Sequence, residues 1–321
     1  MLPFTTTRPE HLARFAALVE WTGVSRLWTG QSMMIEPHQA FAHLAGTGVR
    51  VPVGIGVTLM PLRHPYEAAV QAASLARVTG HPLTMGYGPG AMAFQASLRG
   101  TPYASQLTAV REYLTIVRAL VRGQQIEHEG EYFSFYGRLG DGPGPRIEVG
   151  AGVLRPRMAR VVGEVADVAI TWLTPAPYIR DVIRPALEEG ARAAGKPPAR
   201  IVAMVPLALT TRTRVPAETA LASNAAHLKM PHYRDMLTRA GVELTGASPL
   251  EDADALVRGG AFLSGDLAEL RDKLGEYEGA GVDEVVLNTA GVYKTSSPER
   301  TLTELRTVLE CLDLGGPQRR I

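Results

Sequence analysis

One glycine-rich segment carries the residue types of an anion-binding site. The run VGAGVL (149–154) ends an apolar stretch and leads into RPRMARVVGE, where we expect a helix to begin near Arg155 or Pro156. A proline early in a helix is favourable because its missing N–H would be unpaired there anyway. Free N–H groups at a helix start attract anions, and Arg155 and Arg157 add positive charge. The segment predicts a phosphate site, although a plain turn between a strand and a helix fits the same residues.

Residues capable of proton transfer or hydrogen bonding follow other apolar runs. His38 lies in SMMIEPHQAF, close to Glu36, and could be a proton donor or a histidine that only satisfies a helix start. Thr58 and Tyr87 end two apolar runs, a position where barrel enzymes place reactive groups, although each could instead only hydrogen-bond a cofactor. His64 precedes a proline, which favours a loop histidine that fixes the start of a helix over a catalytic one. His38 and Tyr87 are therefore the candidate proton donors.

Glycine and tryptophan mark further strand ends. The segment GYGPG (86–90) could let the backbone approach a ligand or could simply turn, and it is no Rossmann fingerprint because no helix starts directly after it. Trp28 and Trp172 end two other apolar runs, where they could wall an aromatic ligand or only pack.

Several other chemistries lack their motifs. The sequence contains no HExxH or CxxC pattern and no dense cluster of acidic residues and histidines, so we expect no metal site. It has no GxSxG elbow for a serine nucleophile. Cys311 is the only cysteine, which excludes an internal disulfide and fits a reducing cytoplasm.

Apolar runs of strand length alternate with helical patterns along the chain. The clearest helix is 104–122, where apolar residues recur at steps of three and four. Alternating strands and helices indicate a parallel sheet, and about eight repeats favour a closed (β/α)8 TIM barrel over an open doubly wound sheet. The expected strands are 2–5, 25–30, 51–59, 82–88, 146–151, 167–172, 200–210 and 283–289.

The run 51–59 alternates bulky and small residues. Its bulky set should face the surrounding helices, while Gly54, Gly56 and Thr58 should face the barrel interior. Inward glycines either give a ligand room at the mouth or form a packed layer of small residues.

Two stretches interrupt the alternation within a single expected domain, 1–321. The connection 123–145 is long enough for a short hairpin, and 212–262 reads as short helices between the run 200–210 and the last barrel helix. Long insertions on barrels usually lie over the active-site face, so 212–262 is a candidate lid.

Charge and hydropathy exclude several partner classes. The net charge of +1 gives no field for nucleic acid or an anionic membrane. No apolar run approaches the roughly 20 residues of a membrane span, and the N-terminal segment lacks the pattern of a signal peptide. We therefore expect a cytoplasmic protein.

Several segments, in order along nearly the whole chain, together resemble the bacterial luciferase-like superfamily, which uses FMN or the deazaflavin F420. They include PLRHPYEAAVQAASLARVTG, GYGPG and SQLTAVREYLTIVRALVRGQQIEHEGEYFSF. The stretch PRMARVVGEVADVAITWLTPAPYIRDVIRPALEEGARAAGKPPARIVAMVPLAL and the later HYRDMLTRAGV are similar to the F420-dependent branch.

The resemblance implies a homodimeric barrel whose cofactor ring lies across the C-terminal mouth. Val57 and Thr58 would pass under the ring, at a bulge with a non-proline cis peptide. The phosphate would lie near the turn after the 146–151 strand. The residues implied to bind the cofactor are Val57, Thr58, Gly86, Tyr87, Gly88, Gly150, Ala151, Gly152, Val153, Leu154, Arg157 and Trp172.

Two departures from the family pattern concern the same regions. Relatives often carry a serine–histidine pair where this chain reads GPGAMAF, so an inherited acid–base residue is missing there. The turn GVLRPRM replaces a shorter leucine–glycine–proline turn, which shifts the expected phosphate contacts by a residue or two.

The resemblance predicts an F420-dependent oxidoreductase that transfers hydride from F420H2 to a C=C or C=N bond. The substrate would be a specialised-metabolite intermediate, such as a pyrroline or a dehydroamino acid in a modified peptide. An FMN-dependent monooxygenase and a barrel that binds a flavin without turnover are the alternatives.

Overall fold

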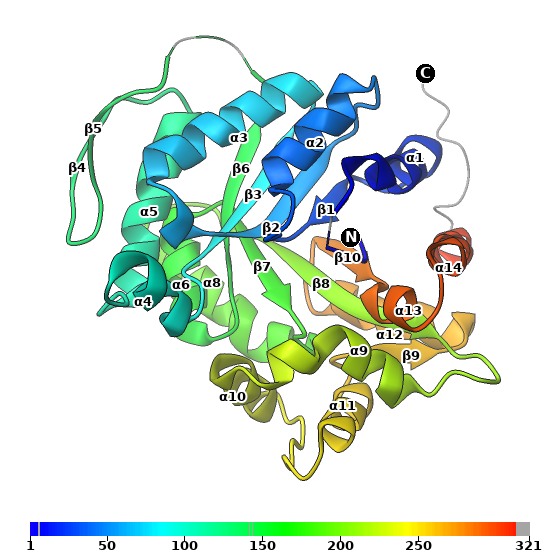
Figure 1. The fold of residues 1–321 in the computed structure, drawn as a ribbon. Coiled ribbons are helices and arrows are strands. Elements are labelled where there is room, and N and C mark those ends of the chain that lie inside the picture. The colour runs from blue at the N-terminus through cyan, green and yellow to red at the C-terminus, as the bar shows by residue number, and fades with distance from the viewer. Residues whose placement is uncertain (6, 141, 143, 313–321) are drawn as a thin grey trace.

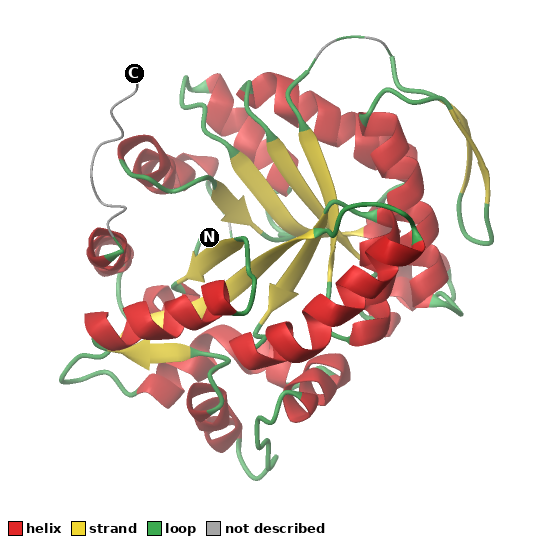
Figure 2. Ribbon diagram, turned by 180° about the vertical axis from the view of Figure 1, so that it is seen from behind, coloured by secondary structure: helices red, strands yellow, loops and turns green. Residues whose placement is uncertain are grey.

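The computed structural model describes residues 1–5, 7–140, 142 and 144–312, so part of the expected domain 1–321 lies outside the described residues. Its main sheet is parallel, with neighbours in the order β1, β2, β3, β6, β7, β8 and β10, while β9 pairs with β8. Figure 1 shows these strands with helices around them, and Figure 2 shows the same enclosure from behind. The strands are β1 Leu27–Thr29, β2 Val53–Leu59, β3 Leu83–Gly88, β6 Ile147–Gly152, β7 Val168–Trp172, β8 Arg200–Leu209, β9 Leu263–Gly265 and β10 Glu284–Asn288.

The sheet is nearly closed, as the predicted (β/α)8 barrel requires. The first residues of the chain lie between its two edge strands. The Leu2 N–H donates to the carbonyl oxygen of Trp28 in β1 at 2.8 Å, and the Met1 amino group donates to that of Leu287 in β10 at 2.8 Å. The expected strand 2–5 was wrong, because this segment makes one bond to each neighbour and no ladder. The short strand β9 was not expected.

Helices flank the barrel, and the clearest prediction, 104–122, corresponds to α5. The flanking helices are α1 Leu12–Trp21, α2 Pro37–Gly46, α3 Pro65–Thr79, α4 Met92–Arg99, α5 Gln106–Val121, α6 Pro156–Val165, α7 Ala176–Tyr178, α8 Arg184–Ala193, α12 Leu267–Gly279, α13 Ala290–Thr295 and α14 Pro298–Cys311. Short 3-10 or π turns occupy η1 Pro9–His11, η2 Met60–Leu62 and η3 Ile179–Ile183. No helix among the described residues has both the length and the apolar character needed to cross a bilayer.

Both predicted interruptions form defined elements. The connection 123–145 contains the antiparallel hairpin of β4 (Ile126–Glu129) and β5 (Ser134–Gly137), which projects from the edge of the molecule in Figure 1. Glu112 of α5 fixes the hairpin turn: its carboxylate accepts hydrogen bonds from the N–H groups of Glu131, Tyr132 and Phe133 at 2.8, 2.9 and 3.0 Å. The segment 212–262 forms α9 (Pro216–Leu228), α10 (Pro231–Arg239) and α11 (Pro249–Arg258).

The barrel interior is filled by its own cluster of side chains. A Cβ on Gly54 would lie 2.5 Å from the Trp28 ring, and one on Gly56 would overlap the end of Met204. These inward glycines therefore make room for interior side chains, which decides their role in favour of packing. The interior cluster consists of Trp28, Val168, Ile170, Val202, Met204 and Val286.

Charged residues close the N-terminal end of the barrel. Arg200 pairs with Glu148 at 2.8 Å and with Glu284 at 3.2 Å, and Arg26 pairs with Glu284 at 3.3 Å. The Trp28 Nε1 also donates to Glu284, at 2.8 Å. Trp28 is thus a packed interior residue that points toward this end, and the ligand-facing end must be the other one.

The stretch that most resembles the F420-dependent branch is built for helix packing. A Cβ on Gly163 of α6 would lie 3.0 Å from the carbonyl carbon of Leu187, and one on Gly190 of α8 would lie 2.9 Å from that of Arg160. The two helices therefore touch along their backbones.

Asp167, between α6 and β7, accepts a hydrogen bond from the Val149 N–H of β6 at 3.2 Å.

Candidate active site

The end of β2 is bulged under the barrel mouth. Its pairing with β3 shifts register between Ile55 and Thr58, and the Gly56–Val57 peptide is cis. The structure thus confirms the bulge and the non-proline cis peptide that the resemblance implied. Val57 packs against the interior cluster, so its side chain lies at the top of the barrel filling.

Three glycines surround Val57 and make room for its side chain. A Cβ on Gly86 or Gly88 of β3 would lie 3.2 or 2.9 Å from the Val57 methyl groups, and one on Gly152 of β6 would lie 3.5 Å away. Backbone without side chains therefore borders the Val57 methyl groups at the end of β2. This arrangement suits a flat ring lying across the strand ends.

Other residues expected near the ring have partners within the protein. Thr58 is fully buried, and its Oγ1 donates to the Oε1 of Gln31 at 2.7 Å. Gly150 packs against Val168, while Ala151 and Val153 are buried in the outer core. Gly150 and Ala151 also pair in the sheet, and the Val153 N–H donates to the carbonyl oxygen of Ile170 at 2.8 Å.

The start of α6 keeps the features of an anion site. Pro156 is its first residue, and no side chain caps the helix. Its first backbone bond is donated by Ala159 to Arg155, so the N–H groups of Arg157 and Met158 have no partner among the described residues. Leu154 is half-buried just before this point.

The two arginines of this turn differ in availability. Arg155 forms an ion pair with Asp235 of α10, at 2.9 Å, and thereby connects the segment 212–262 to α6. Arg157 is exposed and forms no ion pair with another described residue. Arg157 is therefore the free cation beside the unpaired N–H groups.

Tyr87 points away from the mouth. Its side chain is fully buried in the outer core, the hydroxyl lies 3.5 Å from the carbonyl oxygen of Ala68 in α3, and its ring packs 5.2 Å from Tyr113. Burial raises the pKa of the Tyr87 hydroxyl. A hydroxyl enclosed between the sheet and helices cannot reach a ligand at the mouth, so this placement argues against the expected proton-donor role, and we do not retain it.

His38 is held by a carboxylate at the start of α2. Its Nδ1 lies 2.6 Å from Glu36 Oε1, and Glu36 also accepts from Arg63 at 3.4 Å. Burial alone would raise the pKa of the Glu36 carboxyl. Its pKa is instead lowered, chiefly by the hydrogen bond and the charge of His38. The His38 Nε2 is buried without a partner among the described residues. Both sequence interpretations of His38 are therefore compatible with its geometry.

His64 caps α3. Its Nδ1 accepts from the Tyr66 N–H at 3.2 Å, which matches the interpretation as a residue that fixes the helix start.

Trp172 lies at the mouth, and sequence reasoning missed its neighbour. Trp172 continues the inward-facing series Val168 and Ile170 of β7 and packs on the interior cluster. The ring of His227, on α9 of the segment 212–262, lies 5.3 Å from the Trp172 ring and 4.8 Å from that of Tyr233 on α10. Burial, and then the charges of His232 and Lys294, lower the pKa of His227 to about 4. Only its place in the insertion could have singled it out.

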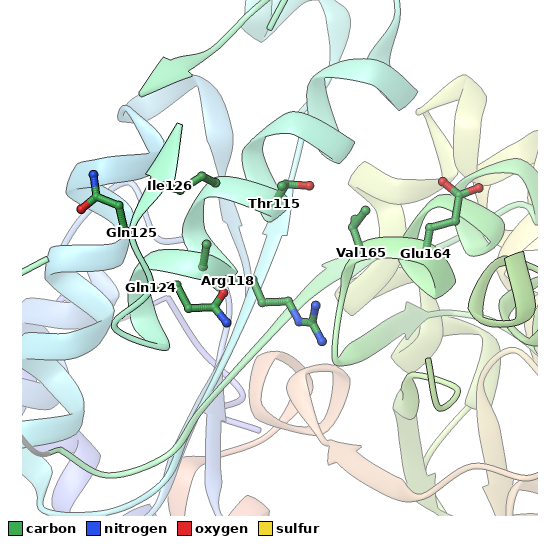
Figure 3. Close-up of a pocket in the computed structure, with 8 residues that line it drawn as sticks. Thr115, Arg118, Gln124, Gln125, Ile126, Glu164 and Val165 are labelled. Carbon is green, nitrogen blue, oxygen red and sulfur yellow. The ribbon is translucent and has the colours of Figure 1, made fainter. Parts of the chain in front are cut away.

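A separate surface cavity of about 350 Å³ lies between the end of α5, the start of β4 and the end of α6 (Figure 3). It is close to the N-terminal ends of the strands, because α6 ends at Val165 just before β7 begins. This cavity is therefore at the opposite end of the barrel from Val57 and Trp172. Its lining is Thr115, Arg118, Ala119, Gln124, Gln125, Ile126, Glu164 and Val165.

Known proteins share this architecture. A 5,10-methylenetetrahydromethanopterin reductase from Methanolobus tindarius is 25% identical over 261 residues, which is 81% of this chain and 77% of that protein. The structure of a coenzyme F420 dependent tetrahydromethanopterin reductase from Methanopyrus kandleri matches with a TM-score of 0.71 and 21% identity, covering 93% of this chain and 94% of the other. Monooxygenase RslO1 from Streptomyces bottropensis matches with a TM-score of 0.68 and 19% identity, over 95% and 92%. These likenesses to solved structures show the fold.

The family assignment comes from the sequence. The family model described as luciferase-like monooxygenase matches residues 3–284, which is most of the chain. This chain therefore belongs to the luciferase-like monooxygenase family.

Proposed function

We propose that this protein is an F420-dependent oxidoreductase that reduces a C=C or C=N bond in a specialised-metabolite intermediate of the pyrroline or dehydroamino acid type. The observation that carries the proposal is the glycine-lined mouth above Val57, combined with the uncapped start of α6. Two of the similar proteins support F420 as the cofactor. One is named 5,10-methylenetetrahydromethanopterin reductase, and the structure of the other is named as coenzyme F420 dependent.

The residues present fit such a cofactor. Gly86, Gly88 and Gly152 carry no side chain beside Val57, which would suit the close approach of a flat ring to the strand ends. The free N–H groups of Arg157 and Met158 and the Arg157 guanidinium suit a phosphate. F420H2, when bound, supplies the hydride, while the protein orients the partners and excludes water.

His38 is our candidate for the group that supplies the proton. Because Glu36 accepts at Nδ1, the imidazole is fixed with Nε2 as its remaining polar atom. A carboxylate that holds one ring nitrogen also orients the other for proton transfer. Proton transfer to a substrate would then use Nε2.

An FMN-dependent monooxygenase is the second candidate. The match to a monooxygenase structure favours it, and FMN also carries a flat ring and a phosphate. A cytoplasmic homodimer remains part of the proposal, since the sequence and the family resemblance imply it.

Fluorescence titration of the purified protein with F420 and with FMN separates these candidates. We expect F420 to bind more tightly. Arg157→Glu should weaken F420 binding at least tenfold, because it replaces a phosphate contact with a like charge. Arg192→Glu is the matched control, since Arg192 lies at the far end of α8. Tight FMN binding without F420 binding would refute the first candidate.

A further inference from the structure

The lid brings one histidine onto the mouth of the barrel. Trp172 is the last residue of β7 and faces inward, and its ring is tilted by 44° against that of His227 on α9. Tyr233 of α10 packs edge-on against the other side of His227, at 82° between the ring planes. His227 therefore contacts both the end of a barrel strand and a second helix of the segment 212–262.

Two polar atoms of this contact lack partners. The Trp172 Nε1 and the His227 Nδ1 are both buried, and neither has a hydrogen-bond partner among the described residues. Buried polar atoms are nearly always paired in native proteins, so two unpaired atoms on touching rings indicate a missing partner. The indole N–H can only donate, which requires that partner to carry an acceptor.

We infer that Trp172 and His227 form a hydrogen-bonding subsite for an oxygen acceptor of the substrate, a carbonyl or carboxylate group next to its reducible bond. The inference rests on the proposed function only for the nature of that bond. The two nitrogens come from different elements, a barrel strand and a lid helix, so a substrate bound between them also holds the lid against the mouth.

The charge around the subsite favours an oxygen with negative charge. His227 is neutral at pH 7 because burial lowers its pKa to about 4, so its imidazole can donate from one nitrogen. Lys294 supplies the nearby positive charge, whereas burial lowers the pKa of His232 and keeps it neutral at pH 7. Lys294 is fixed by donating to the carbonyl oxygen of Ala222 on α9, at 3.0 Å. A carboxylate therefore gains both hydrogen bonds and a favourable potential.

Isothermal titration of F420-saturated protein with 1-pyrroline-2-carboxylate tests the subsite. The matched ligand is 2-methyl-1-pyrroline, which keeps the C=N bond and lacks the carboxylate. We expect the carboxylate to bind at least about tenfold more tightly, the factor that one good hydrogen bond gives. Equal binding of the two ligands, or no binding of the carboxylate, would overturn the inferred acceptor.

Variants identify the nitrogen that binds. His227→Phe keeps a ring and should weaken the carboxylate by about 10- to 100-fold. His227→Asn places an amide nitrogen near the Nδ1 position and should restore much of that loss. Trp172→Phe should also weaken it. His232→Asn is the control on the same lid, because neither ring nitrogen of His232 is a buried unpaired atom. Unfolding midpoints near that of the wild type establish that each variant is folded.

The result also separates this inference from the proposed function. If His227→Phe binds the carboxylate as the wild type does while F420 affinity is retained, the subsite is wrong and the cofactor assignment stands. If the wild type does not bind F420 but, titrated without cofactor, binds the carboxylate in a His227-dependent way, the subsite stands and the proposed function falls.

Discussion

Gly190→Ala should destabilise the protein, although alanine is the better helix former. A Cβ at this position would lie 2.9 Å from the carbonyl carbon of Arg160 and 3.1 Å from the Glu164 nitrogen, and closer still to the Arg160 oxygen. These are backbone atoms of α6, so the two helices must move apart. Such overpacking costs about 3 kcal/mol, and the gain in helix propensity offsets about 1 kcal/mol. The expected net loss in unfolding free energy is about 2 kcal/mol.

Urea unfolding followed by circular dichroism measures this loss directly. Gly275→Ala is the matched control: it is the same substitution inside α12, where an added Cβ meets nothing within 4 Å. It should raise the unfolding free energy by about 0.5 to 1 kcal/mol. If Gly190→Ala were as stable as the wild type, the close backbone contact between α6 and α8 would not exist in solution.

Two further predictions concern Glu112 and His227. Glu112→Ala removes the acceptor of three N–H groups in the hairpin turn. It should lower the unfolding free energy by about 3 kcal/mol and expose the hairpin to proteases. A urea midpoint unchanged from that of the wild type would contradict this. His227 has a pKa of about 4 when folded, against an ordinary histidine value of 6.5, so the unfolded chain binds a proton at this residue first as the pH falls. Unfolding free energy should therefore fall by up to about 3 kcal/mol as the pH drops from 6.5 to 4, and His227→Asn should reduce that fall. Parallel pH curves for wild type and variant would show that His227 is not buried as described.

The barrel and its interruptions could be predicted because hydrophobic periodicity reports burial. The helix at 104–122 and the hairpin within 123–145 are local patterns, and both are present. The segment 2–5 was wrongly predicted to be a strand, because an apolar run indicates burial but does not show that the backbone forms a ladder of hydrogen bonds with a neighbouring strand. Leu2 is buried, yet only single hydrogen bonds join its neighbourhood to the edge strands.

The site was harder to predict because it depends on which way side chains point. Tyr87 and Gly86 are neighbours in sequence, but alternation along β3 sends the tyrosine outward and leaves the glycine at the mouth. The bulge in β2 brings Val57 inward against that alternation, and only the family resemblance anticipated it. The contact between His227 and Trp172 could not be predicted from sequence, because 54 residues separate them along the chain.

The central claim is that the mouth above Val57 holds F420, and a fluorescence titration of the purified protein with F420 tests it most directly. We predict saturable binding that is tighter than that of FMN and that weakens at least tenfold in Arg157→Glu but not in Arg192→Glu. Absence of F420 binding, or binding that Arg157→Glu leaves unchanged, would contradict the claim.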